Sequence, residues 1–218
     1  LGRGKLWSFS NQVYDNIFWS LTSGVGQLTI FQVISMWLLA NNYSPLNDFL
    51  ENPFWFFGFF ILLPIWSAFH FYWIHRFLHI PMLYKRYHSL HHRNVNVGPW
   101  SGLSMHPVEH LLYLSTILVH FFIPSTPLHF VYQGLHTCLG AQKGHTGYER
   151  LVVDPKSGKS IPSAGYFHYL QHKYFECNYG KLTSPLDKWF GSFHDGTQKT
   201  HDKLFKSNRS VSYTHLTL

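Results

Sequence analysis

Five histidines fall within a stretch of eighteen residues at helical spacings. They are His75, His79, His88, His91 and His92. The first two are four residues apart and the last three stand at i, i+3 and i+4, so each set is predicted to share one face of a helix. Ile80-Pro81 lies between the sets and predicts a helix break that lets them converge. Because imidazole is the commonest protein ligand of metals, the pattern indicates a transition-metal site.

A later pair, His168 and His172, repeats the four-residue spacing, with Gln171 at the i+3 position. With His145 and the five histidines above, this pair makes eight candidate ligands. A structural zinc site needs only four ligands, typically including cysteines, so eight histidines suit two metal ions. Soluble di-iron bundles are rich in glutamate. In this chain the carboxylates within plausible range of the histidines are few, namely Glu109, Glu149, Asp154 and Glu176. Zinc and iron both accept imidazole, so the ligand type alone does not choose between them.

The composition favours a membrane protein. Charged residues make up only 12%, against about 25% in ordinary soluble domains, while 45% are hydrophobic. The net charge of +7 is uneven, since residues 1–75 carry −1 and the rest of the chain therefore carries +8. The basic residues form no single stripe, which fits a membrane-apposed face and argues against a nucleic-acid partner. Two cysteines outside any CxxC motif indicate a reducing compartment.

Two charge-free stretches are predicted to be long membrane helices. Ile17–Ala40 has 24 residues, about 36 Å as a helix, and Pro53–Ile74 has 22 with Pro64 as an expected kink. A third stretch, 110–142, is interrupted at residues 124–127 and is predicted to be a short helical hairpin. It either spans a thinned membrane or re-enters from the cytoplasmic side, and in both cases the chain returns to the side it left. The expected fold class is therefore all-α, an integral membrane helical bundle with a histidine-rich helical cap.

The positive-inside rule gives this bundle an orientation. Four basic residues follow the second span closely, namely Arg76, Lys85, Arg86 and Arg93. They place the histidine-rich cap in the cytoplasm, with Arg3 and Lys5 on the same side and the loop 41–52 on the other.

The remaining segments are expected to be less regular. Residues 149–164 are predicted to be a polar loop, 166–179 a helix ending near Gly180, and 185–193 a short helix that packs in the core or anchors at the interface. His194, His201 and His215 are expected to be solvated. The chain begins at Leu1, which indicates a fragment, and Ser210–Leu218 resembles a cloning or sequencing scar.

The histidine spacings resemble those of a known family. HRFLH (75–79), HSLHH (88–92) and HYLQH (168–172) resemble the HxxxH, HxxHH and HxxHH boxes of the fatty acid hydroxylase superfamily, also called the sterol desaturase family. The likeness covers roughly residues 55–196. It extends to FYWIHR, SGLSMHPVEH (101–110), GHTGYE (144–149), YFECNYG (174–180) and PLDKWFGSFHDG (185–196). This implies three parts: an N-terminal membrane helix and loop (1–52), a fatty acid hydroxylase-like domain (53–196) and a tail (197–218).

The resemblance implies a membrane-bound di-iron oxygenase that hydroxylates or desaturates a lipid with O2 and two electrons. The electrons would come through cytochrome b5 and its reductase, and zinc could replace the two iron ions on isolation. The implied location is the endoplasmic reticulum in a eukaryote or the inner membrane in a bacterium, with the active site facing the cytoplasm. The implied metal ligands are His75, His79, His88, His91, His92, His145, His168 and His172.

The third box departs from the family pattern, because Gln171 stands where the family has histidine. Glutamine is a weaker ligand, so a non-catalytic relative with a structural or lipid-binding metal site is the alternative hypothesis, and a metal transporter is a third. Second-tier candidates for the site are Gln171, His106, His110 and His136. Trp100 and Met105 are candidates to line a lipid slot. The substrate stays open among sterol, fatty acyl chain, sphingoid base and carotenoid, as does the choice between hydroxylation and desaturation.

Overall fold

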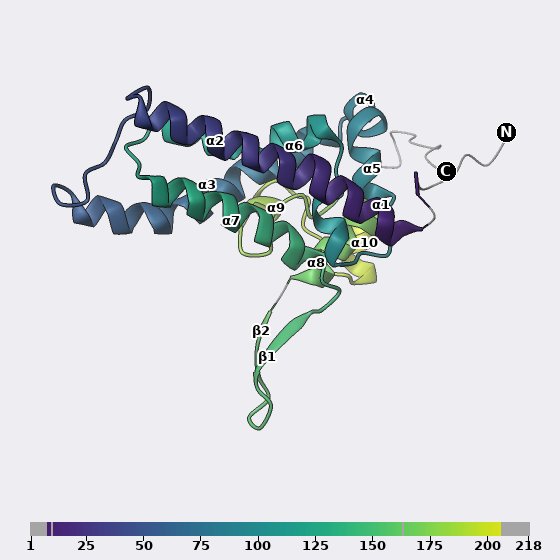
Figure 1. Cartoon of the computed structure of the whole chain (residues 1–218). Coiled ribbons are helices and arrows are strands. Elements are labelled where there is room, and N and C mark those ends of the chain that lie inside the picture. The colour runs from purple at the N-terminus through teal and green to yellow at the C-terminus, as the bar shows by residue number, and fades with distance from the viewer. Residues whose placement is uncertain (1–7, 10, 163, 206–218) are drawn as a thin grey trace.

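Two long helices dominate the computed structural model, which describes residues 8–9, 11–162 and 164–205 (Figure 1). The first runs without interruption through α1 (Gln12–Trp19), a π-helical turn (Ser20–Val25) and α2 (Gly26–Ala40). The second is α3 (Pro53–Leu78), which continues through Pro64. Asn11 and Asn52 cap the two starts, because each side chain accepts a backbone N–H of the first turn.

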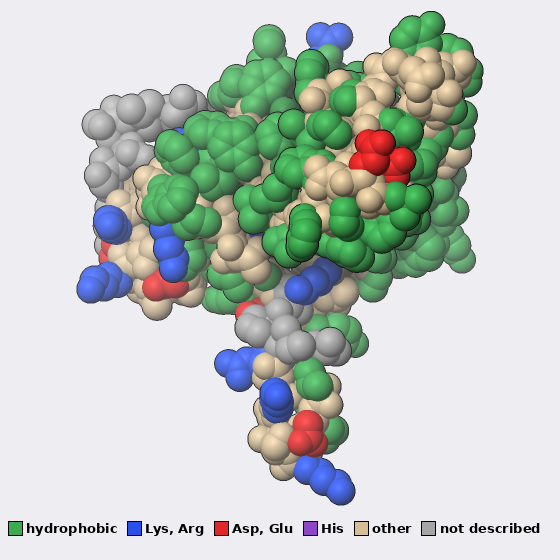
Figure 2. Space-filling model, turned by 90° about the vertical axis from the view of Figure 1, so that its left-hand side faces the viewer, with side chains coloured by type: hydrophobic (Ala, Val, Ile, Leu, Met, Phe, Trp, Pro, Cys, Tyr) green, Lys and Arg blue, Asp and Glu red, His purple; other side chains and the backbone are tan. Residues whose placement is uncertain are grey.

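Both expected membrane helices are confirmed, with longer bounds than predicted. Gln12–Ala40 and Pro53–Leu78 are long and apolar enough to cross a membrane, and most of each lies outside the protein core. Trp37, Ile61 and Ile65 are exposed. Figure 2 shows hydrophobic side chains over most of the bundle in its view. Such a surface suits lipid rather than water, so the fold is an all-α membrane bundle.

The predicted hairpin is also present. α6 (Pro107–Leu114) continues as a 3₁₀ helix (Ser115–Phe121), and α7 (Pro127–Gly144) returns alongside. At the turn, the Asn47 N–H donates to the Ser125 carbonyl at 3.0 Å and the Ser125 N–H to the Pro45 carbonyl at 3.1 Å. The loop between the long helices and the hairpin turn therefore meet at one end of the bundle, and α7 ends beside α8 at the other.

Short helical elements form the histidine-rich cap. The chain breaks after α3 as predicted and resumes at Pro81. The elements are α4 (Pro81–Leu83), a π-helical turn (Tyr84–His88), α5 (Ser89–His92), a 3₁₀ turn (Pro99–Leu103), α8 (Gly165–Tyr174), α9 (Leu186–Trp189) and α10 (Gln198–Phe205). α10 lies in the predicted tail. The suspected scar, His215, Arg3 and Lys5 lie outside the described residues.

The predicted polar loop is wrong, because residues 150–162 form a β-hairpin that projects from the bundle (Figure 1). β1 (Arg150–Asp154) pairs antiparallel with β2 (Lys159–Pro162), Val152 opposite Ser160. The Asp154 side chain accepts the Lys156 N–H, and Gly158 has a φ of +69°, so the polar residues make the turn between two short strands. The turn signals were visible in the sequence, but the strands were too short to show a period.

The predicted helix 166–179 is too long. α8 ends at Tyr174, and Phe175 and Asn178 adopt left-handed φ values of +64° and +54°. The Asn178 amide then donates to the carbonyls of Phe167 and His194, each at 3.0 Å. Residues 175–180 therefore form a loop rather than a last helical turn, and this loop reaches back to α3.

Candidate metal centre

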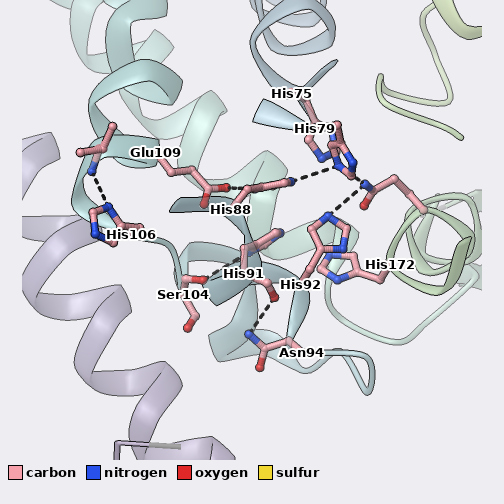
Figure 3. A network of polar contacts seen from close by, with 12 residues as sticks. His75, His79, His88, His91, His92, Asn94, Ser104, His106, Glu109 and His172 are labelled. Atoms are coloured by element: carbon pink, nitrogen blue, oxygen red, sulfur yellow. Dashed lines mark hydrogen bonds and ion pairs between the residues drawn. The ribbon is translucent and has the colours of Figure 1, made fainter. Parts of the chain in front are cut away.

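The structure brings all eight predicted ligands together in two groups of four. The first group is His75, His79, His88 and His92, and the second is His91, His145, His168 and His172. Within each group the candidate ligand atoms all lie within 4.8 Å of one another. Six of the imidazoles are labelled in Figure 3, where their rings gather between α3, the α4–α5 segment and α8.

The expectation that His88, His91 and His92 share one face is wrong in one respect. His88 and His92 belong to the first group and His91 to the second. On a helix, the residues three and four positions on from His88 lie on either side of it, about 100° apart. The ring of His91 accordingly contacts those of His145 and His172, whereas the ring of His92 contacts that of His79. α5 therefore stands between the two groups and supplies both.

The ring nitrogens are spaced as metal ligands would be. The Nε2 atoms of His79 and His88 are 3.2 Å apart, and His168 Nε2 lies 2.8 Å from His145 Nε2 and 3.2 Å from His172 Nε2. Nitrogens bound at about 2.05 Å to one ion lie about 2.9 Å apart at right angles and about 3.3 Å apart in a tetrahedron. These neighbouring donor atoms therefore stand at distances that one ion in each group could bridge.

The histidines are also in the protonation state that metal binding needs. Burial, followed by the neighbouring imidazoles, lowers the pKa of His79, His92 and His172 well below the ordinary value. The same causes lower the pKa of His91 to about 3. Neutral imidazoles expose a nitrogen lone pair at pH 7, so the two groups can bind cations without first losing protons.

Four of the eight histidines are held through Nδ1. The partners are the Tyr179 carbonyl for His75 (2.7 Å), Glu109 Oε1 for His88 (2.7 Å), the Ser104 carbonyl for His91 (3.3 Å) and Ser101 Oγ for His145 (2.7 Å). A carbonyl oxygen can only accept, so Nδ1 of His75 and His91 carries the proton and Nε2 carries the lone pair. The two carbonyl contacts fix the tautomers of His75 and His91, and all four contacts fix the ring orientation before any ion binds.

Sequence reasoning missed the two serines of this set. Ser101 and Ser104 lie in and just after the 3₁₀ turn that packs on α7. The close approach depends on Gly102, because a Cβ there would lie 2.8 Å from the Ala141 carbonyl oxygen. The signal that points to them in the sequence is the SGLSMHPVEH motif, whose importance comes only from the family resemblance.

Asp187 positions the loop that supports His75. Its carboxylate accepts the N–H groups of Tyr179 and Gly180, each at 2.8 Å, and the Ser192 hydroxyl at 2.7 Å. A Cβ on Gly180 would lie 2.8 Å from this carboxylate, so only glycine fits. The NYG and PLD motifs therefore act together to hold the Tyr179 carbonyl against His75.

Gln171 is buried in the first group, although its helix carries the second. Its Nε2 lies 2.8 Å from His79 Nε2 and 3.1 Å from His92 Nε2, and its Oε1 has no hydrogen-bond partner among the described residues. A half-turn of the amide exchanges the two atoms, so the side chain can offer N–H groups to neutral imidazoles or oxygen to a cation.

The other second-tier histidines lie outside both groups. His106 caps α6, where its Nδ1 accepts the Val108 N–H at 3.1 Å. His110 is buried, and its Nδ1 lies 2.8 Å from Ser23 Oγ. His136 Nε2 lies 3.5 Å from Lys181 Nζ. The expectation that His194 is solvated is wrong, since its ring is buried against Tyr174.

A cavity of about 280 Å³ adjoins the histidines. Its wall includes members of both groups, such as His88 and His168, and apolar side chains such as Phe71 and Met105. Trp100, the other candidate for a lipid slot, is not among the lining residues. Five of the eight imidazoles, with members from both groups, thus border an apolar space within the bundle.

Comparison with known proteins gives the chain a family. The sequence profile described as Fatty acid hydroxylase matches residues 59–192, which include all eight histidines. The chain belongs to the fatty acid hydroxylase family. The resemblance read from the histidine spacings is therefore confirmed.

Curated members of the family similar to this chain are named Delta(7)-sterol 5(6)-desaturases. That of Eremothecium gossypii is 32% identical over 156 residues, 70% of this chain and 41% of that protein. One from Gibberella zeae, ERG3B, is 30% identical over 133 residues, 61% of this chain and 40% of that protein. That of Schizosaccharomyces pombe is 29% identical over 214 residues, 92% of this chain and 66% of that protein. The chain thus spans less than half the length of the first two, and no solved structure matches it.

Proposed function

We propose that this protein is a membrane-bound lipid hydroxylase or desaturase that uses two iron ions, O2 and two electrons. The observation that carries the proposal is the pair of four-histidine groups, buried beside an apolar cavity at the end of a membrane bundle. The family membership and the sterol desaturase relatives support an oxidoreductase acting on a lipid. The bound metal pair would supply the activation of O2 for attack on an unactivated C–H bond.

The residues of the chain have three tasks in this proposal. The eight imidazoles hold the ions as neutral ligands, four of them oriented through Nδ1. Phe71 and Met105, with the other apolar lining, exclude water from the reacting carbon. Glu109, the one carboxylate among the described residues that line the cavity, contacts His88 and, when ionised, would offset part of the charge of the bound ions.

The orientation and the electron donor belong to the same proposal. Arg76, Lys85 and Arg86 lie at the end of α3 and in the α4–α5 segment, where the metal groups are. This basic end supports a cytoplasmic active site and docking of an electron donor such as cytochrome b5. The membrane would be the endoplasmic reticulum in a eukaryote and the inner membrane in a bacterium.

The test is to express the intact gene, profile the lipids of the host cells and measure metal in the purified protein. We expect an O2-dependent hydroxylated or unsaturated lipid and about two ions per chain. The matched control replaces His172, a second-group member, with alanine and should yield no product. One tightly held ion per chain and an unchanged lipid profile would favour the non-catalytic alternative that Gln171 motivates.

The Gln171→His variant tests the departure in the third box. An imidazole at this place would point at His79 and His92 and add a strong nitrogen donor to the first group. We expect that group to release its ion to a chelator roughly tenfold more slowly, with turnover unchanged or higher. The control is Lys173→His, which adds a histidine at an exposed position of α8. Equal release rates in Gln171→His and the unmodified protein would show that residue 171 does not touch the ion.

A further inference from the structure

One wall of the cavity carries a half-buried lysine. Lys181 follows the Tyr179–Gly180 loop that Asp187 holds in place, so its backbone is fixed. Its Nζ lies 3.5 Å from His136 Nε2 and over Gly140 of α7, 3.7 Å from where a Cβ on that glycine would lie. The ammonium group is therefore directed into the bundle and lines the cavity.

The charge around this ammonium is uncompensated. Lys143 also lines the cavity, whereas Glu109, the one acidic residue of the described lining, is engaged with His88. No carboxylate of the described residues forms an ion pair with Lys181. Burial, followed by the charge of Lys143, lowers the pKa of Lys181 to about 8, so the side chain is still mainly protonated at pH 7. A half-buried ammonium that has a histidine neighbour but no carboxylate partner among the described residues is a place where an anion can bind.

The position of Lys181 relative to the second histidine group can be read along α7. Lys181 Nζ lies beside Gly140, and the His168 ring lies beside Gly144, 3.4 Å from where a Cβ there would stand. These glycines are four residues apart, about 6 Å along the helix. An anion at Lys181 would therefore sit about one helical turn from the histidines.

We propose that Lys181, with His136 beside it, binds the anionic head group of an amphiphilic lipid, a carboxylate or a phosphate ester, and so places the carbons next to that head group against the metal groups. The proposal rests on the proposed function, since it names the substrate class of the same cavity. A neutral sterol hydroxyl can accept a hydrogen bond from the ammonium but brings no opposite charge, so we expect it to bind more weakly than an anion.

The test is equilibrium binding to the full chain in detergent micelles, with four radiolabelled probes. Palmitate and hexadecyl phosphate carry the anion, hexadecanol shares the chain without the charge, and cholestanol stands for a sterol. We expect at least one of the anionic probes to bind about tenfold or more tightly than hexadecanol and cholestanol, as a charge-assisted hydrogen bond would provide. The better of the two identifies the head group as carboxylate or phosphate.

Variants separate charge from folding. Lys181→Gln should bring the preferred anionic probe to the affinity of hexadecanol, Lys181→Arg should retain the preference, and Lys188→Gln, at an exposed lysine of α9, should change nothing. Equal binding of all four probes to the unmodified chain, or an equal loss of all four in Lys181→Gln, would overturn the proposal. Binding is measured without turnover, so the two proposals can fail separately. If the chain prefers anionic probes but holds no metal and forms no lipid product, the proposed function is wrong and the anion site stands.

Discussion

Replacing His91 with alanine is expected to abolish lipid oxidation and to reduce the metal content from about two ions per chain to about one. His91 belongs to the second group, where its ring lies 4.9 Å from that of His145 and 4.7 Å from that of His172. His88 and His92 flank it, but both belong to the first group and cannot replace it. Turnover should fall at least about 100-fold, because three donors hold an ion less tightly than four.

The measurements for His91→Ala are metal content of the purified protein and product formation by the cells. The matched control is His106→Ala, which removes a histidine that caps α6 and lies outside both groups. That control should keep both ions and lose about 1 kcal/mol of stability at most through the missing cap. Two ions retained in His91→Ala would show that the second group is not a metal site.

Replacing Glu109 with alanine should weaken the first group without removing a ligand. The His88 Nδ1–H donates to Glu109 Oε1 at 2.7 Å, and both side chains are buried. Removing the carboxylate frees the His88 ring to rotate and leaves a buried donor unpaired, a loss of about 1–3 kcal/mol. We expect metal affinity of the first group to fall about 10–100-fold, as for other partners of metal-bound histidines.

A second variant at this position separates orientation from charge. Glu109→Gln keeps a carbonyl oxygen that can accept the His88 proton, so it should lose less affinity than Glu109→Ala. For both Glu109 variants the measurement is the rate at which the protein releases metal to a chelator. The control is Glu176→Ala, which removes an exposed carboxylate. If Glu109→Ala releases metal as slowly as that control, the contact with His88 has no role in metal binding.

Much of the architecture could be predicted from local sequence. A helix that crosses lipid must be long and free of charge, and this property is visible residue by residue, so Ile17–Ala40 and Pro53–Ile74 were located almost to their ends. The break at Ile80-Pro81 is equally local, since proline has no N–H to continue the helix of α3. The β-hairpin at 150–162 was missed because its strands are only five and four residues long.

The candidate ligands were identifiable because helical spacing sets the relative directions of His75 and His79, or of His168 and His172, within one segment. Spacing says nothing about the distance between segments. Packing of α5 between α3 and α8 decided that His91 faces a different group from its neighbours. Packing also chose Glu109 among four candidate carboxylates, and brought Tyr179, Ser101 and Lys181 to the site from distant loops. The sequence by itself determined which side chains are candidate metal ligands and which helices are long and apolar enough to cross a membrane, because both follow from chemistry within a few residues. Only the tertiary structure decided how the histidines divide and what supports them, because those contacts join residues up to about a hundred positions apart.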